Sequence, residues 1–525
     1  MSDRVTRPGS VGCLGSLGGF GASRRALLGG FAAAATAVAT GGCAPQQLAA
    51  APTPVQPRAQ ARRKLVRGGI IYTADASDRV LPGGWILVEG DQIAAIGGRG
   101  APEPRADQIL DASRYMVLPG LINAHWHECF VAPDHETPDD RTMETSAYSR
   151  GGDIEALGTL FSFVTKIQDL LPLEEALPIA RWSMWTQLRS GTTTLGDIGS
   201  ANSPDGLAQA ALDLGMRIRM SRWSGDIVMP NASKVFRRFA DADKDAAAWV
   251  DLMDKWNQHP SGLVRSMPSV MGSFCSSDEQ LKLLREVATK YNSPFAAHLG
   301  ALRNEAEANR RIFGVSGIER FEKFGLITDK LLSVHTAWAS EDEYKLLLDR
   351  RVNIVHSPAH YGQLGEHTVA TGQIGRYLRD GGVVASSTDG NIWYIGGMPE
   401  AMRAAHLGHN EALNDTFACP PLAALRTGTR HGATALGWDD AIGSLEIGKQ
   451  ADIVIVDIDD FRYATSNHPL RTFLVCGSSK DVRTVLVAGR VVVEDGRSMM
   501  MDEEAMLNDL RKAVVTARAR FKPPV

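Results

Sequence analysis

The sequence predicts an α/β protein in which a (β/α)8, or TIM, barrel is inserted into a small β-sandwich domain. Two observations lead to this prediction. Between residues 118 and 437, short apolar strands alternate with longer helical patterns. On either side, residues 65–117 and 438–500 contain short strands and turns. We therefore expect the two flanks to pair with each other as one domain around the inserted barrel.

Eight strands are expected in the barrel, and each precedes a helical pattern. They are predicted at residues 117–123, 192–198, 217–223, 263–269, 294–299, 331–338, 352–357 and 383–389. One helix start is marked by Ser340, an N-cap residue, with Glu343 three positions later, which together form a capping box. Eight β/α units over roughly 300 residues are what such a barrel needs. Residues 501–525 are expected to end the chain as a charged helix.

Composition and charge exclude some classes of partner. The chain has 525 residues, 44% of them hydrophobic and 22% charged, with a net charge of −4. These values are ordinary for a globular protein with a large core. They indicate no polyanion-binding surface, so no nucleic-acid partner is expected. No internal apolar run is long enough to span a membrane.

The first 43 residues have the features of an export signal. Arg24 and Arg25 precede a weakly apolar run, which ends in small residues and Cys43. This pattern resembles a twin-arginine signal with a lipoprotein cleavage site. We therefore expect a periplasmic protein or one anchored by lipid at Cys43, with no other membrane contact; the alternative is a disordered Ala/Gly tail. Residues 44–64, rich in Ala, Pro and Gln at the start, are expected to be a linker.

Metal-binding side chains follow several of the predicted strands. His125 and His127 are separated by one residue, so on an extended strand they point the same way and can bind one divalent cation. The alternative for this pair alone is two structural histidines. Barrel enzymes place their chemistry at the C-terminal ends of the strands. The strand ends also supply His298, His335, His356 and Asp389. So many polar groups at one rim are hard to explain by core packing.

Together these residues resemble the amidohydrolase superfamily, in its cytosine-deaminase-like and chlorohydrolase-like branch. The resemblance covers roughly residues 65 to 500 and is much more specific for the superfamily than for a substrate. The matching segments are Pro119-Gly120, His125-x-His127, Gly191-Thr192-Thr193-Thr194, Cys275-Ser276, His298, His335, His356-x-Pro358, Thr388-Asp389-Gly390 and Ile442 to Asp452.

The resemblance implies one divalent metal ion, with Zn²⁺ expected and Fe²⁺ as the alternative. The implied ligands are His125, His127, His298 and Asp389. His335 would polarise the substrate or steady the attacking water, or else hold a ligand in place. Asp389 would take a proton from water and pass it to the leaving group, or else serve only as a ligand. The fourth strand carries no Lys or Glu to bridge a second ion.

Two departures from the family pattern affect the predicted reaction. The family usually has Glu three residues after the fifth-strand histidine, where it protonates a substrate ring; here that position is Ala301. Glu305 follows too late to replace it. We therefore expect hydrolysis of a non-peptide carbon–nitrogen bond in an amide, cyclic amide or urea-like small molecule. The alternative is an aminohydrolase or chlorohydrolase of a purine, pyrimidine or triazine. A third reading is a non-catalytic metal-binding surface lipoprotein.

Four residues are candidate contacts for the small-molecule substrate. His360 and Tyr361 stand where the family usually has Ser-Asn, and both can form hydrogen bonds. Trp393, shortly after Asp389, could form an aromatic wall, and Arg150 lies in the long segment after the first metal strand. The alternative for these residues is loop packing. The sequence is compatible with a homo-oligomer.

Overall fold

The computed structural model describes residues 61–128, 152–390 and 396–520. These residues belong to one compact unit of the chain. The predicted leader with Cys43 and the candidate substrate contacts Arg150 and Trp393 lie outside the described residues. None of the helices that the structure describes combines the length and the apolar character needed to cross a membrane.

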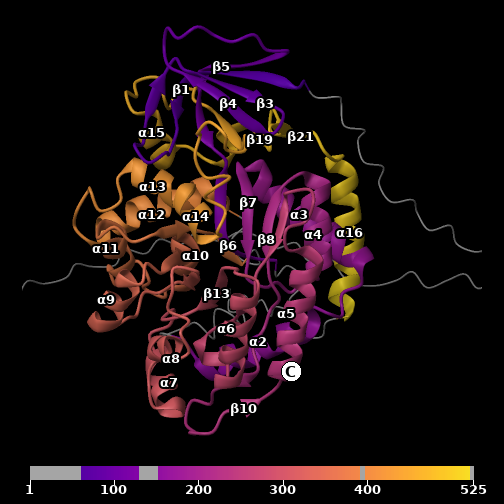
Figure 1. Cartoon of the computed structure of the whole chain (residues 1–525), viewed down its shortest axis with the longest axis vertical. Helices are drawn as coiled ribbons and strands as arrows, with labels where there is room; N and C mark the ends of the chain where they lie inside the picture. The colour runs from indigo at the N-terminus through magenta and orange to yellow at the C-terminus, as the bar shows by residue number, and fades with distance from the viewer. Residues whose placement is uncertain (1–60, 129–151, 391–395, 521–525) are drawn as a thin grey trace, which may run out of the picture. The chain divides into compact units, whose positions relative to one another are not determined.

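The two flanking segments meet in one nine-stranded sheet (Figure 1). Its order is β21-β20-β19-β18-β5-β1-β3-β4, and β2 pairs with β1. The link between the flanks is the antiparallel pairing of β5 with β18, in which Val117 lies opposite Ile455. The expected pairing of the two flanks is therefore confirmed. The strands are β1 (Arg63–Tyr72), β2 (Val80–Pro82), β3 (Trp85–Glu89), β4 (Gln92–Gly97), β5 (Gln108–Pro119), β18 (Ile453–Asp457), β19 (Val482–Val487), β20 (Arg490–Glu494) and β21 (Arg497–Ser498).

The central region forms two parallel five-stranded sheets, ordered β11-β8-β7-β6-β17 and β12-β13-β14-β15-β16. The predicted fourth and eighth strands are each split in two, and each half belongs to a different sheet. Pro268 lies at the first break, where it has no N–H for a ladder. The strands are β6 (Leu121–His127), β7 (Thr192–Asp197), β8 (Arg217–Met220), β11 (Val264–Ser266), β12 (Ser269–Val270), β13 (Phe295–His298), β14 (Leu331–Val334), β15 (Asn353–His356), β16 (Val384–Ser386) and β17 (Asp389–Gly390).

Helices follow the parallel strands, and the predicted capping box is confirmed. Ser340 Oγ accepts the N–H of Glu343 at 3.3 Å, and the Glu343 carboxylate accepts the N–H of Ser340 at 2.7 Å. The predicted C-terminal helix is Glu503–Arg520 (α16). The other helices are α2 (Ile154–Ile167), α3 (Leu173–Arg189), α4 (Pro204–Leu214), α5 (Ala242–Trp256), α6 (Asp278–Lys290), α7 (Glu305–Phe313), α8 (Gly317–Lys323), α9 (Glu341–Asp349), α10 (Pro358–Leu364), α11 (Gln373–Arg379), α12 (Met398–Ala412), α13 (Pro421–Thr427), α14 (Arg430–Ala435) and α15 (Pro469–Cys476).

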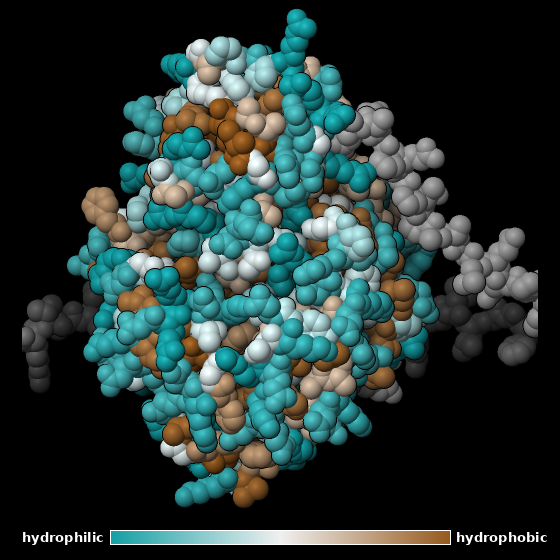
Figure 2. Space-filling view, viewed as in Figure 1, coloured by the Kyte–Doolittle hydropathy of each residue, from teal (hydrophilic) through white to brown (hydrophobic). Residues whose placement is uncertain are grey.

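Alternate residues of the parallel strands build a shared apolar cluster. Because side chains alternate along a strand, every second residue faces the same side. The strand residues of this cluster include Ile122, Ala124, Ala296, Leu332, Val334, Val355 and Ala385, all buried. The face of the molecule in Figure 2 is largely hydrophilic, with smaller apolar patches. The apolar cluster therefore packs within the same strands whose C-terminal ends carry the candidate site.

Candidate metal centre

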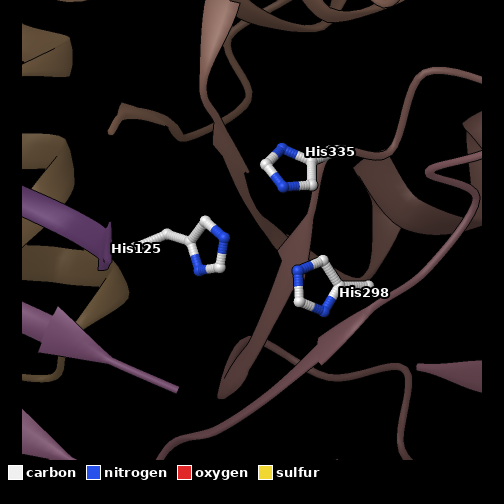
Figure 3. Close-up of side chains that lie close together, drawn as sticks. All are labelled: His125, His298 and His335. Carbon is white, nitrogen blue, oxygen red and sulfur yellow. The ribbon is translucent and has the colours of Figure 1, made fainter. Parts of the chain in front are cut away.

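Four predicted site residues lie at or directly after the C-terminal ends of parallel strands, and a fifth begins a short parallel strand. His125 and His127 are in the last three residues of β6, and His298 ends β13. His335 follows the last residue of β14, and Asp389 begins β17. Figure 3 shows the rings of His125, His298 and His335 converging on a common space. Strands that run in parallel bring these ends together at one edge.

The donor atoms lie close enough to share one ion. Two sets, His125 with His298 and His335, and His125 with His127 and Asp389, each have donor atoms within 4.8 Å of one another. Asp389 Oδ1 lies 3.4 Å from His125 Nε2 and 3.9 Å from His127 Nε2. All five residues are buried. The structure thus brings together the four predicted ligands and His335.

Hydrogen bonds orient two of these imidazoles. The Nδ1 atoms of His127 and His298 contact the backbone oxygens of Gly199 and Met271, the second at 2.5 Å. A protonated Nδ1 leaves the lone pair of Nε2 available for a metal ion. Nδ1 of the fully buried His125 has no hydrogen-bond partner among the described residues. Three imidazoles and a carboxylate are a donor set that fits a divalent transition metal.

The protonation states suit this use. Burial lowers the pKa of His125 and His335, and lowers that of His298 well below its usual value. Burial would raise the pKa of Asp389, but the nearby His125, His360 and His335 outweigh it and hold that pKa well below its ordinary value. Metal ligands must be neutral imidazoles and ionised carboxylates. The pKa directions of His125, His298 and Asp389 are therefore those expected of metal ligands.

Of the other candidate site residues that the structure describes, one has a structural hydrogen bond and two lie beside the ligands. His356 ends β15, but its Nε2 forms a hydrogen bond with Thr368 Oγ1 at 3.0 Å. This bond gives the ring a structural role. His360 and Tyr361, in α10, are almost fully buried. The Tyr361 ring centre lies 4.1 Å from that of His335, and His360 acts electrostatically on Asp389. The structure therefore places His360 and Tyr361 beside the metal cluster, which consists of the four predicted ligands and His335.

Glu305 has a role that the sequence analysis did not foresee. It begins α7, and its carboxylate accepts the N–H groups of Gly300 at 3.0 Å and Ala301 at 2.8 Å. It also accepts the hydroxyl of Ser273 at 2.5 Å. The carboxylate thus holds the loop that follows His298. The signal in the sequence is an acidic residue at a helix start, where backbone N–H groups need acceptors.

Asn123 is a second supporting residue that was missed. Its amide nitrogen donates to Thr388 Oγ1 at 2.7 Å, and its amide oxygen accepts the N–H of Thr388 at 3.1 Å. The bonds connect β6 with the residue directly before Asp389. The available signal was an amide within the apolar run that precedes His125, because a polar group buried there needs hydrogen-bond partners.

The chain is similar to known proteins over most of its length. Residues 116–492 match the amidohydrolase family. A 5-methylthioadenosine/S-adenosylhomocysteine deaminase from Acetivibrio thermocellus is 26% identical over 450 residues, 84% of this chain and 96% of the relative. A 5'-deoxyadenosine deaminase from Methanosarcina barkeri is 24% identical over 454 residues, 86% of this chain and 97% of the relative.

Solved structures show the same fold. An adenosine deaminase from Xanthomonas campestris with bound zinc has a TM-score of 0.72 at 22% identity, covering 87% of this chain and 98% of its own. An atrazine chlorohydrolase from Arthrobacter aurescens complexed with zinc has a TM-score of 0.75 at 24% identity, covering 86% and 100%. These likenesses imply a TIM-barrel-like domain. The chain belongs to the amidohydrolase family and is a metal-dependent hydrolase of carbon–nitrogen bonds.

Proposed function

We propose that this protein is a zinc-dependent aminohydrolase that replaces the amino group of a purine-type ring with a hydroxyl group. The observation that carries the proposal is the pair of buried donor groups that share His125, one with His298 and His335 and one with His127 and Asp389. They occur in a chain whose curated relatives, matched over 93–98% of their length, are named as adenosine-type deaminases. This reaction was the alternative prediction from the sequence, and hydrolysis of an amide, cyclic amide or urea was the main one.

We also propose that the two parallel sheets close into a (β/α)8 barrel inserted in a β-sandwich. Support comes from the two split strands. β16 pairs with β15, while β17, two residues further along the chain, pairs with β6. In the same way β11 pairs with β8 and β12 pairs with β13. Each split strand would thus join one sheet to the other.

In this function, His125, His127, His298 and Asp389 would hold the zinc ion. A bound zinc ion supplies the Lewis acidity that makes water nucleophilic near neutral pH. Asp389, kept ionised by its surroundings, accepts the proton of the attacking water and delivers it to the departing amine. His335, 2.8 Å from Asp389 Oδ2, orients that carboxylate, and Tyr361 packs beside His335 against the substrate.

Hydrolysis of an amide or urea is the second candidate, because one specific observation favours it. Ring deamination needs an acid that protonates a ring nitrogen. Ala301 supplies only a buried methyl group, and the carboxylate of Glu305 is already used by the hydroxyl of Ser273 and by backbone N–H groups. An amide carbonyl is electrophilic without ring protonation. Under the main proposal, another residue must donate this proton.

Product analysis separates the two candidates. The zinc-loaded full chain would be incubated with adenine nucleosides, an aminotriazine, a cyclic amide and an aryl urea, and its products identified by mass spectrometry and an ammonia assay. Exchange of an amino group for hydroxyl on the nucleosides supports the main proposal. Addition of water to the cyclic amide or cleavage of the urea, with the nucleosides unchanged, contradicts it and supports the second. Asp389→Asn is the control for contaminating hydrolases.

We propose, from the sequence alone, export by the twin-arginine route with a lipid at Cys43, and action there on small molecules. Fractionation of cells that produce the full chain tests this. Replacing Arg24 and Arg25 by Lys should retain the protein in the cytoplasm, because the translocation signal needs the arginine pair. Cys43→Ala should release an exported protein from the membrane fraction. An unchanged distribution of either variant would contradict its part of the proposal.

A further inference from the structure

A polar pocket lies at the opposite end of the strands from the histidines. Pro294 and Lys330, which line it, immediately precede β13 and β14, whereas His298 and His335 stand at the other ends of these strands. The pocket has a volume of about 350 Å³. Four residues of strand span ~13 Å at ~3.3 Å per residue, so this pocket is separate from the metal cluster.

Two arginines stand side by side in the wall of this pocket. Arg219 of β8 and Arg265 of β11 are direct partners in the parallel register, so their side chains share one face of the sheet. Both guanidinium groups lie against the ring of Trp438, at 5.6 Å and 4.4 Å from its centre. Like charges directly opposite each other on neighbouring strands repel.

Arg219 is buried without a matching carboxylate. It is only 4% exposed, yet in the described part of the chain no ion pair is formed by Arg219 or Arg265. Other buried arginines are paired: Arg217 lies 2.8 Å from Asp452, and Arg320 lies 2.8 Å from Asp278. A buried charge without a partner is costly, which distinguishes this site from ordinary structural ion pairs.

The donors of these side chains are only partly used within the protein. Arg219 Nη1 donates to the backbone oxygen of Ser266 at 2.8 Å, while its buried Nε has no hydrogen-bond partner among the residues that the structure describes. Arg265 Nη1 donates to the backbone oxygen of Gly437 at 3.2 Å. Since a guanidinium group has five N–H donors, several remain for a ligand.

The nearby charges leave an excess of positive charge. Burial, with a contribution from Arg265, lowers the pKa of Arg219 to about 9, while Asp440 acts in the opposite direction. Lys330 and Asp329 also line the pocket. Three cationic side chains are thus opposed by two carboxylates, and Asp440 is exposed to solvent. An anion in the pocket would restore neutrality.

We propose that this pocket binds a small oxyanion of the phosphate type, held by the guanidinium groups of Arg219 and Arg265 with Lys330 at its rim. The planar fork of a guanidinium matches two oxygens of a phosphate or carboxylate. The site is independent of the proposed reaction. It would act as a stabilising ligand site, because an anion bound only to the folded state opposes unfolding.

The test measures the melting temperature of the full chain with increasing inorganic phosphate, at ionic strength held constant with sodium chloride. We expect a saturable increase in Tm for the wild type. Arg265→Gln, at a partly exposed position, should weaken phosphate binding at least tenfold, and isothermal titration calorimetry would measure this. Acetate in place of phosphate tests whether a carboxylate is also accepted.

The matched control is Arg237→Gln, at an exposed arginine outside the pocket. Both variants keep the metal cluster, so phosphate binding to a metal ion would affect them equally. Lys330→Gln provides a second pocket variant that does not alter the buried pair. Equal shifts in Tm for wild type and the Arg265 and Lys330 variants, a non-saturating increase, or no phosphate binding by the wild type would each overturn the proposal.

Discussion

Asp389 Oδ2 lies 2.8 Å from His335 Nε2, and both residues have a left-handed backbone, with φ of 63° and 62°. This conformation is uncommon for residues other than glycine, and functional sites are one of the places where it is retained. The N–H of His335 is held by the oxygen of Val355 at 2.7 Å, and that of Gly390 by the Asp389 carboxylate at 2.7 Å. These bonds hold the two side chains facing each other.

Asp389→Asn should leave the fold intact and reduce kcat about 10²–10⁴-fold, because the amide has a similar size but cannot accept a proton. Steady-state kinetics on a substrate identified by product analysis, with circular dichroism and metal content, checks this. If the variant loses its metal together with its activity, the role of Asp389 as a ligand is sufficient to explain the loss. Asp342→Asn, at an exposed carboxylate of α9, is the control. Full activity in a metal-loaded Asp389→Asn variant would disprove both roles.

Removal of the metal should abolish activity and lower the melting temperature. The imidazoles are buried around the site, so without an ion their lone pairs lose their partner. Free zinc at about 1,000 times its Kd adds about 4 kcal/mol to the free energy of unfolding. Calorimetry measures the melting temperature, and an activity assay measures turnover, after dialysis against a chelator and again after adding back one equivalent of zinc. A melting temperature unaffected by the chelator would contradict a metal site in this buried cluster.

Ala301→Glu should increase ammonia release from adenine nucleosides, since it restores an acid at the position where the family usually carries one. The larger side chain enters a packed site, so we also expect a loss of about 1–3 kcal/mol in stability. Ala301→Gln is the matched control, because it has the same size and cannot donate a carboxyl proton. Equal ammonia release by the folded Glu and Gln variants would show that ring protonation at this position does not limit the reaction.

Asp245 should make the protein less stable as the pH rises from about 4 to about 7. Burial, with a contribution from Asp226, raises its pKa from 3.8 to about 7 in the folded state. Between these values the folded chain binds more protons than the unfolded chain, so the free energy of unfolding falls with pH and levels off above 7. Asp245→Asn should reduce this decline in chemical denaturation measurements, while Asp197, whose pKa burial also raises to about 7, should maintain the remainder. Asp251→Asn, exposed on the same helix, should retain it.

The main elements of the fold could be predicted because their signals are local. Short apolar runs between helical patterns indicated the parallel strands, and the pair Ser340 and Glu343 indicated a helix start that the structure contains. The breaks within the fourth and eighth strands could not be predicted. They depend on which neighbouring strand each half pairs with, as shown by the bond from Thr388 to Asn123, 265 residues earlier in the chain.

The candidate ligands could likewise be read from histidines and an aspartate at successive strand ends, since strand direction alone brings such residues to one edge. His356 fitted the same pattern, but only the structure shows that its ring is bonded to Thr368. The sequence by itself determined the family, the donor types and their order along the chain. Tertiary structure decided which groups meet: Glu305 with the loop after His298, and Arg219 beside Arg265. Register and burial arise from contacts between distant segments, which no local pattern records.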